Sequence, residues 1–343
     1  MRTLLTALLA FAAGVLLMTL VGRHSPSHVA SATNMASGAS TANNPATSSS
    51  SSDSDDSSDS NDNWPNQGPS PEQVFYAQPG MMHTALSQLG PRVPGKTNLY
   101  LLTFAGDGGE DVFRNEAEYA AQLFTKRFGP TAHALVLENN PTTLQTHPLA
   151  DWSNLESALD GLWTVMKPDQ DILVLYLTSH GDEDHNLLVD MDPLPLDQIG
   201  APDLAGILKK HPFKWKVVVV NACYSGGFIP DLHSAGTLVL TAARTDRSSF
   251  GCGSDSDITY FGKAWLVDAM NRTDDFVDAF QYAKTDIEGW EKQDKLTPSE
   301  PQINIGEGIV QQLAMWRRDV KPGAAVPFAP PPASASSAPA AAQ

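Results

Sequence analysis

The sequence predicts an α/β fold in which helices flank both faces of a mainly parallel, doubly wound sheet. Residues 171–178 and 216–221 are almost continuous apolar, β-branched runs, which are typical of strands buried on both faces of a parallel sheet. Runs of this kind alternate along the chain with stretches in which apolar residues recur at helical spacing. Such alternation predicts parallel strands joined by right-handed helical crossovers.

Each expected strand is a short apolar run bounded by glycine, proline or polar residues. In chain order these strands are residues 97–105, 131–138, 171–178, 216–221, 236–243 and 301–306. Residues 187–190 follow a polar loop and are expected to form one arm of a small hairpin.

The expected helices show apolar residues on one face and end near glycine or proline. The first begins at Glu110 and is terminated by Gly129 and Pro130. The second begins at Asp151, with Pro168 beyond its end. The remaining helices are expected at residues 203–210, 260–270, 274–293 and 310–318.

The composition divides the chain into a central domain and flexible extensions. Residues 24–90 are rich in Ser, Asp and Asn and have too little apolar surface to offset chain entropy, so a disordered linker is expected. The Pro- and Ala-rich residues 321–343 are expected to form a second disordered tail. Residues 91–320 are long enough to form one compact domain with a full core.

The N-terminal segment predicts export. Arg2 precedes an apolar run from Leu4 to Val21, so residues 1–23 are expected to be a signal peptide or an N-terminal membrane anchor. The protein would then be anchored in the inner membrane and face the periplasm, or be periplasmic or secreted if the signal is cleaved. Membrane contact is expected through this segment only.

Charge and motif spacing exclude several other classes. A net charge of -17 argues against binding to nucleic acid, which requires neutralisation of phosphates. Residues 180–185 contain enough donor atoms for a metal, but their spacing fits no standard zinc pattern, and a solvated acidic loop is expected. The turn at residues 106–109 lacks the lysine and the spacing of a phosphate loop. The sequence therefore predicts neither a cofactor nor a metal, and it leaves the oligomeric state open.

Two reactive side chains stand at strand ends. His180 and Cys223 each follow an apolar strand, and glycine comes soon after each of them. Ligands of open α/β sheets bind beyond the carboxyl ends of the strands, and neighbouring strands lie about 4.8 Å apart. If the two strands are neighbours, the imidazole and the thiol form a nucleophile and base pair. Cys223 is expected to be a free thiol rather than the disulfide partner of Cys252, the only other cysteine.

These segments resemble the legumain family of cysteine peptidases. Ser179–Gly181 and Asn221–Gly226 are similar to the His-Gly and Ala-Cys blocks of that family, and residues 241–252 are similar to its Thr-Ala-Ala block with paired serines. Phe113 and Arg114 match the aromatic-Arg pair that opens the first helix. The family includes the catalytic subunit of the glycosylphosphatidylinositol transamidase and shares a structural clan with caspases and gingipains. The resemblance covers roughly residues 98–265 and implies a caspase-like fold.

The resemblance also implies roles for individual residues. Cys223 would attack a peptide carbonyl to form a thioester, and His180 would transfer the protons. The backbone N–H groups of Gly181 and Cys223 would form the oxyanion hole. Arg114, Ser248 and Ser249 would line the pocket for the residue before the scissile bond.

The sequence departs from the legumain pattern at three positions. Asn221, also taken as substrate-binding, stands where the family has an acidic residue two positions before the nucleophile. Lys263 stands in place of a pocket aspartate, and Val112 in place of an asparagine that orients the histidine. Selectivity for asparagine is therefore not carried over.

The function expected from the sequence is that of an exported cysteine endopeptidase acting on peptides or proteins. Two alternatives remain. The same dyad could serve a transpeptidase or transamidase, because an amine can resolve a thioester as well as water. The protein could also be a catalytically silent, caspase-like binding protein, although the presence of both Cys223 and His180 argues against this reading.

Overall fold

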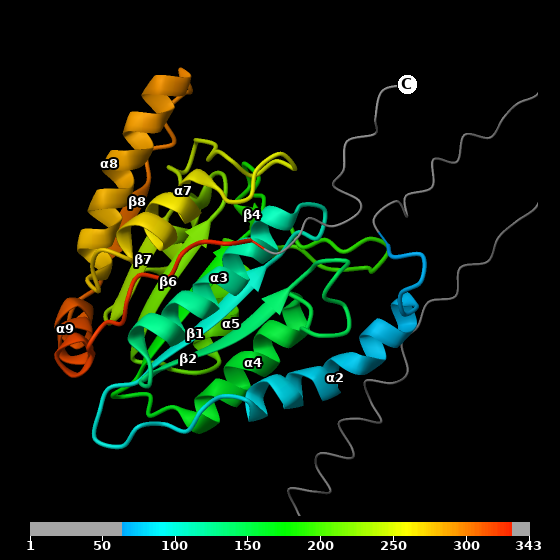
Figure 1. Cartoon of the computed structure of the whole chain (residues 1–343), viewed down its shortest axis with the longest axis horizontal. Coiled ribbons are helices and arrows are strands. Elements are labelled where there is room, and N and C mark those ends of the chain that lie inside the picture. The colour runs from blue at the N-terminus through cyan, green and yellow to red at the C-terminus, as the bar shows by residue number, and fades with distance from the viewer. Residues whose placement is uncertain (1–63, 331–343) are drawn as a thin grey trace, which may run out of the picture. The chain divides into compact units, whose positions relative to one another are not determined.

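The computed structural model describes residues 64–330. The predicted signal or anchor at 1–23, most of the predicted linker and the end of the tail lie outside these residues. The described part is built on a six-stranded sheet in the order β2-β1-β3-β6-β7-β8 (Figure 1). A separate pair, β4 (Asn186–Leu187) and β5 (Ile199–Gly200), forms the small antiparallel hairpin expected near residue 187.

The sheet is parallel except at one edge. Its strands are β1 (Leu99–Ala105), β2 (Ala132–Glu138), β3 (Ile172–Thr178), β6 (Trp215–Asn221), β7 (Thr237–Thr241) and β8 (Gln302–Ile305). β8 runs antiparallel to β7, whereas the other pairs are parallel. Every residue of β1 and β3 is buried, which explains why these strands are apolar throughout rather than alternating.

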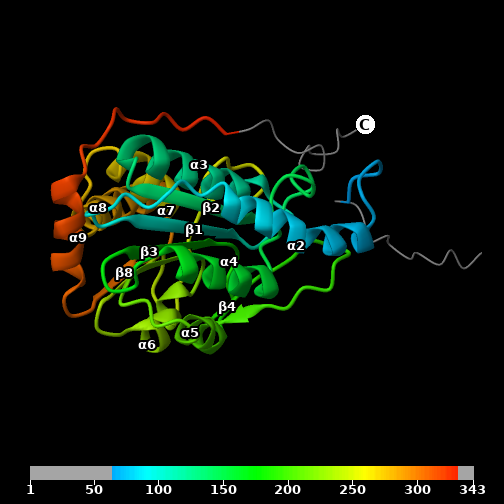
Figure 2. The same ribbon diagram turned by 90° about the horizontal axis from the view of Figure 1, so that it is seen from below.

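Helices cover both faces of the sheet, as predicted (Figure 2). One face carries α3, α7, α8 and α9, and the other carries α2, α4, α5 and α6. Their bounds are α2 (Pro71–Ser87), α3 (Asp111–Phe128), α4 (Trp152–Val165), α5 (Ala201–Lys209), α6 (Ile229–Leu232), α7 (Tyr260–Gly262), α8 (Phe276–Asp294) and α9 (Ile309–Asp319). A π-helical segment, Lys263–Ala269, extends α7, and a 3₁₀ turn, Ser225–Phe228, precedes α6.

Two apolar cores lie on opposite faces of the sheet because successive strand side chains alternate in direction. Leu101, Val174 and Val219 pack into the core under α3 and α8, whereas Leu102 and Leu175 pack into the core under α4 and α5. The strands are thus packed against helices on both faces of the sheet. Their carboxyl ends, where His180 and Cys223 follow, are held by this packing.

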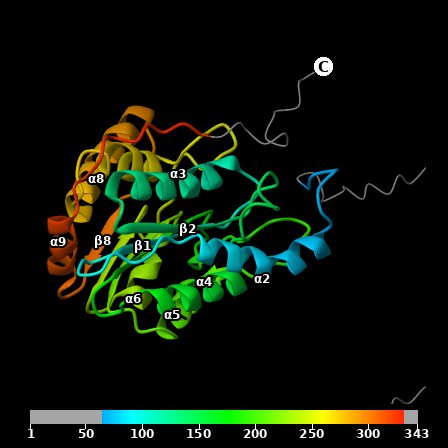
Figure 3. The same cartoon turned by 60° about the horizontal axis from the view of Figure 1, so that its bottom comes forward.

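Helix α2 corrects the prediction that residues 24–90 form a disordered linker. Ser70 caps the helix in a capping box with Gln73, and Val74 and Met82 are buried beneath it. The side chain of Gln78 accepts a hydrogen bond from Leu149 N at 2.9 Å. Figure 3 shows α2 alongside α4 and the edge strand β2. The structured part of the chain therefore begins before residue 91.

The segment after α9 corrects the second boundary, because residues 321–330 do not all belong to a disordered tail. Val326 is buried, and its carbonyl oxygen accepts a hydrogen bond from the hydroxyl of Tyr119 at 2.8 Å. Its N–H donates to Asn271 Oδ1 at 2.8 Å. These contacts attach the segment to α3 and to the loop before α8.

Candidate active site

The two reactive side chains follow strands that are neighbours in the middle of the sheet. β3 and β6 are paired in parallel, with Thr178 opposite Asn221 at their carboxyl ends. His180 stands two residues beyond Thr178, and Cys223 stands two residues beyond Asn221. The structure therefore places both residues at the same level of the same edge, as the sequence predicted.

Gly181 lies directly against the backbone of Cys223. A Cβ atom at Gly181 would come within 2.3 Å of the carbonyl oxygen of Cys223, so only glycine fits there. Among residues 64–330, no hydrogen-bond acceptor pairs with the N–H of Gly181 or with that of Cys223. Two neighbouring N–H groups are thus available to bind an oxyanion.

The turn after Cys223 has an unusual backbone. Tyr224 adopts a left-handed conformation with φ 55° and ψ 13°, which costs a non-glycine residue about 1 kcal/mol or more. Its N–H donates to the carbonyl oxygen of Arg247 at 2.7 Å. The loop that contains Arg247 continues to Ser249, whose N–H lies 3.2 Å from the Sγ atom of Cys223. The loop after β7 is thus hydrogen-bonded to both the turn at Tyr224 and the sulfur of Cys223.

The environment of Cys223 favours its thiolate. Both cysteines are free, as expected for Cys223. The hydrogen bond from the Cys252 thiol is the largest influence that lowers the pKa of Cys223, to about 5, and the hydrogen bonds from Ser249 and the charge of His180 add to it. Burial opposes these effects. The same pairing raises the pKa of Cys252, so Cys223 is the cysteine that ionises more readily. At neutral pH Cys223 is therefore the more reactive of the two thiols.

The imidazole of His180 is held by two carboxylates that the sequence analysis did not identify. Its Nε2 atom lies 3.1 Å from Glu110 Oε2 and 3.6 Å from Asp107 Oδ2. The ring of Phe113 packs edge-on against it, with centroids 5.1 Å apart. Because the carboxylates occupy Nε2, the Nδ1 atom remains to exchange protons with a substrate.

Asp107 and Glu110 interact with each other as well as with the histidine. Burial, together with the neighbouring Glu110, raises the pKa of Asp107 to about 7, although the hydrogen bond from Gly109 and the charge of His180 oppose the rise. Both residues belong to the segment that follows β1, and β1 is the neighbour of β3. In the sequence, the partners of His180 could therefore be found as a pair of acidic residues beyond the end of the strand that neighbours β3.

Asn221 faces the protein interior rather than a substrate pocket. It is 1% exposed, and its Nδ2 atom donates to the buried carboxylate of Glu116 at 2.7 Å. Glu116 also accepts hydrogen bonds from Tyr176, Thr178 and Thr259. A Cβ at Gly262 would come within 2.1 Å of Glu116 Oε1, which explains the glycine at that position. The network ties α3 to the strands that carry His180 and Cys223.

Of the other three predicted pocket residues, one is buried and two are accessible to solvent. Arg114 is 2% exposed and donates hydrogen bonds to Asn140 at 3.3 Å and to Thr142 at 2.9 Å. Arg114, like Asn221, is therefore buried in this structure, and its contact with a substrate stays a prediction. Ser248 is exposed and Ser249 is half-buried beside Cys223.

A family comparison agrees with this arrangement. Residues 155–312 match the model described as the Peptidase C13 family, which is the legumain family. Over these residues the chain is similar to the legumain family. A search among curated proteins finds no match for it. The similarity supports cysteine peptidase activity and a caspase-like α/β fold with a mostly parallel sheet.

This chain differs from the expected legumain pattern at two functional positions and has related side chains elsewhere. Val112 is fully buried in an apolar cluster with Ala105 and Phe113. Glu110, two positions earlier, supplies the contact to the imidazole. The acidic group missing at Asn221 is present as Glu116, which reaches the same place from α3.

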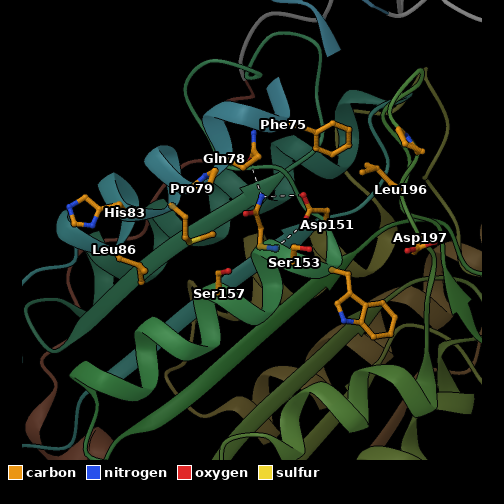
Figure 4. A pocket seen from close by; sticks show the side chains of 14 residues that line it. Phe75, Gln78, Pro79, His83, Leu86, Asp151, Ser153, Ser157, Leu196 and Asp197 are labelled. Atoms are coloured by element: carbon orange, nitrogen blue, oxygen red, sulfur yellow. Dashed lines mark hydrogen bonds between the residues drawn. The ribbon is translucent and has the colours of Figure 1, made fainter. Parts of the chain in front are cut away.

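A pocket in the described part of the chain lies apart from these residues. It has a volume of about 610 Å³ and is lined by α2, the start of α4 and residues 195–197. Figure 4 shows His83 and Leu86 toward one end of the pocket and Phe75 and Leu196 toward the other. None of the predicted site residues lines it. The predicted acidic loop after His180 does not line this pocket either. Within the loop, Asp182 is hydrogen-bonded to Asn186, and His185 packs on Gly227.

Proposed function

We propose that the protein is a cysteine endopeptidase that cleaves peptides or proteins with Cys223 as nucleophile and His180 as acid and base. The observation that carries this proposal is the position of the two residues. Both stand two positions beyond paired residues of adjacent central strands. The lowered pKa of Cys223 supports catalysis over a silent binding role, because a thiolate is the reactive form.

The proposed reaction uses each group at a stated atom. The Cys223 thiolate attacks the peptide carbonyl, and the N–H groups of Gly181 and Cys223 bind the oxyanion that forms. His180, with Nε2 held by Glu110, donates a proton from Nδ1 to the leaving amine. The thioester is then hydrolysed by a water molecule that gives its proton to the same nitrogen, which regenerates the thiolate.

The decisive experiment compares the full chain with its Cys223→Ala variant on a library of internally quenched peptides. We expect cleavage to disappear while circular dichroism and the melting temperature stay unchanged. Thr285→Ala, at an exposed position of α8, is the matched control and should cleave at the wild-type rate. Cleavage by Cys223→Ala at the wild-type rate would refute the proposal.

Substrate selectivity should depend on the loop after β7. Ser248 and Ser249 are the predicted pocket residues that solvent reaches, whereas Arg114 and Asn221 are interior. We infer a preference at the residue before the scissile bond that is not specific for asparagine. A positional-scanning library would reveal this preference, and a profile restricted to asparagine would contradict the inference.

We further infer that the protein is exported and tethered by its N-terminal segment. The support is the apolar run from Leu4 to Val21. Within residues 64–330, no helix combines the length and the apolar character needed to cross a membrane. Cell fractionation should recover the full chain outside the cytoplasm, and removal of residues 1–23 should retain it inside. Equal distribution of the two forms would rule out this role of the segment.

A further inference from the structure

A second cluster of titratable side chains lies outside the candidate active site. It joins Glu118 of α3, Glu138 at the end of β2 and His147 of the loop between β2 and α4. One ligand atom from each residue lies within 4.8 Å of the others. The Nδ1 atom of His147 is 3.2 Å from Glu138 Oε1. Three separate segments of the chain thus converge on one point.

Glu138 is the unusual member of this cluster. It is 1% exposed, and its close polar neighbour among the described residues is the ring of His147, since neither carboxylate oxygen accepts a hydrogen bond of ordinary geometry. The nearby hydroxyl of Thr143 donates to the carbonyl oxygen of Asn140 at 3.3 Å. Burial raises the pKa of Glu138 to about 8 and outweighs the charge of Arg114, which lowers this pKa. Such a buried carboxylate is ionised at neutral pH only with a cationic partner.

We propose that Glu118, Glu138 and His147 form a binding site for a divalent transition metal, with Zn²⁺ preferred. One imidazole and two carboxylates are a common ligand set for zinc, which binds nitrogen and oxygen at about 2.0–2.2 Å. Ligand atoms around such an ion lie roughly 3.3 Å apart, which is close to the 3.2 Å between His147 and Glu138. His147 is 35% exposed, so the ion has access from solvent and a water molecule can complete its coordination.

The site would fix the loop that supports Arg114. His147 belongs to the same loop as Asn140 and Thr142, which both accept hydrogen bonds from the Arg114 guanidinium. A metal held by Glu118 and Glu138 would therefore fasten this loop to both α3 and the end of β2. The role of the ion is structural, and no step of peptide cleavage passes through it.

Metal binding can be tested by titrating the full chain with Zn²⁺ in a calorimeter. A Cys223→Ala background prevents binding by the reactive thiolate. We expect one site, lost in His147→Ala and weakened at least tenfold in Glu118→Gln. Glu110→Gln is the matched control, because Asp107, Glu110 and His180 form the other candidate cluster among the described residues. It should bind Zn²⁺ as its parent does.

Thermal unfolding provides a readout that is independent of activity. Zn²⁺ at about 100 times its dissociation constant should raise the melting temperature by about 5 °C or more, and His147→Ala should show no such rise. Mg²⁺, which prefers oxygen ligands and octahedral geometry, should have no effect. An absence of Zn²⁺ binding, or binding lost in Glu110→Gln but kept in His147→Ala, would overturn the proposal. Neither result depends on whether the chain cleaves peptides.

Discussion

The Nε2 atom of His180 lies 3.1 Å from Oε2 of Glu110, although the two residues are 70 positions apart in the chain. In the proposed mechanism, this contact determines which ring nitrogen carries the proton and places a negative charge beside the imidazolium. We therefore propose that Glu110 is a positioning residue. We expect Glu110→Gln to lower kcat/KM by about 10- to 100-fold without a large loss of stability, because its side chain is partly exposed.

The pH profile separates this role from a structural one. Replacing the carboxylate by an amide should alter the pH dependence of kcat/KM, whereas loosening of the fold would lower the rate equally at every pH. Glu288→Gln, at an exposed position of α8, removes a similar carboxylate and should leave rate and profile unchanged. A wild-type rate and profile in Glu110→Gln would contradict the assignment.

The thiol of Cys252 should control the reactivity of Cys223. Its hydrogen bond is the largest influence that lowers the pKa of Cys223 to about 5. In Cys252→Ala this pKa should rise, so the midpoint of alkylation by iodoacetamide should move up by about one pH unit or more. The thiolate predominates above the pKa, so the variant should react slowly at pH 6 and normally at pH 9. An unchanged midpoint would show that the Cys252 thiol has no effect on the pKa of Cys223.

Close packing at Gly181 should make this position intolerant of any side chain. An added methyl group would meet the carbonyl oxygen of Cys223 at 2.3 Å, which forces the two backbone segments apart. Gly181→Ala should therefore lower kcat by about 100-fold or more, because removal of oxyanion stabilisation alone has this effect. Gly206→Ala is the control, since no atom lies within 4 Å of its added methyl group. Similar kcat values in the two variants would contradict the prediction.

Asn221→Asp should destabilise the fold. The new carboxylate would lie beside Glu116, whose oxygen is 2.7 Å from Asn221 Nδ2, and both groups are buried. Two buried carboxylates at this distance must share a proton, so the pKa of one is raised in the folded state. The folded variant is favoured at low pH, where that proton is bound, and loses stability as the pH rises through the raised pKa.

Urea unfolding at pH 5 and pH 8 would measure this effect. We expect a loss of about 3–5 kcal/mol at pH 8 and a smaller loss at pH 5. Asn66→Asp, at an exposed position, should change stability little at either pH. Equal stability of Asn221→Asp and the parent at pH 8 would mean that Glu116 is already neutral.

The strands and most helices could be predicted because apolar runs and helical spacing are local properties of the chain. The placement of His180 and Cys223 beyond the ends of adjacent strands followed from the rule that parallel strands present their carboxyl ends at one edge. Helix α2 was missed because Pro79 and Gly80 interrupt it and its apolar residues are few, so its composition resembles that of a linker. Its stability comes from burial against α4, which the local sequence does not encode.

The partners of the reactive residues were harder to predict. Glu110 reaches His180 only because β1 lies beside β3, and that order of strands is not visible in the sequence. Glu116 and Asn221 are 105 positions apart. Comparison of single positions with the family pattern shows only that residue 221 is not acidic, whereas in the structure the acidic group comes from Glu116 of α3.

The pairing of Thr178 with Asn221 has a practical consequence for anyone who alters the interior of this molecule. The distance between the Cys223 sulfur and the His180 imidazole depends on the register between β3 and β6, which have seven residues each. Shortening the side chain of a buried valine of β6 would lower the rate of the proposed cleavage before it changes spectroscopic measures of folding. The cleavage rate would then report small changes in the packing of the central strands.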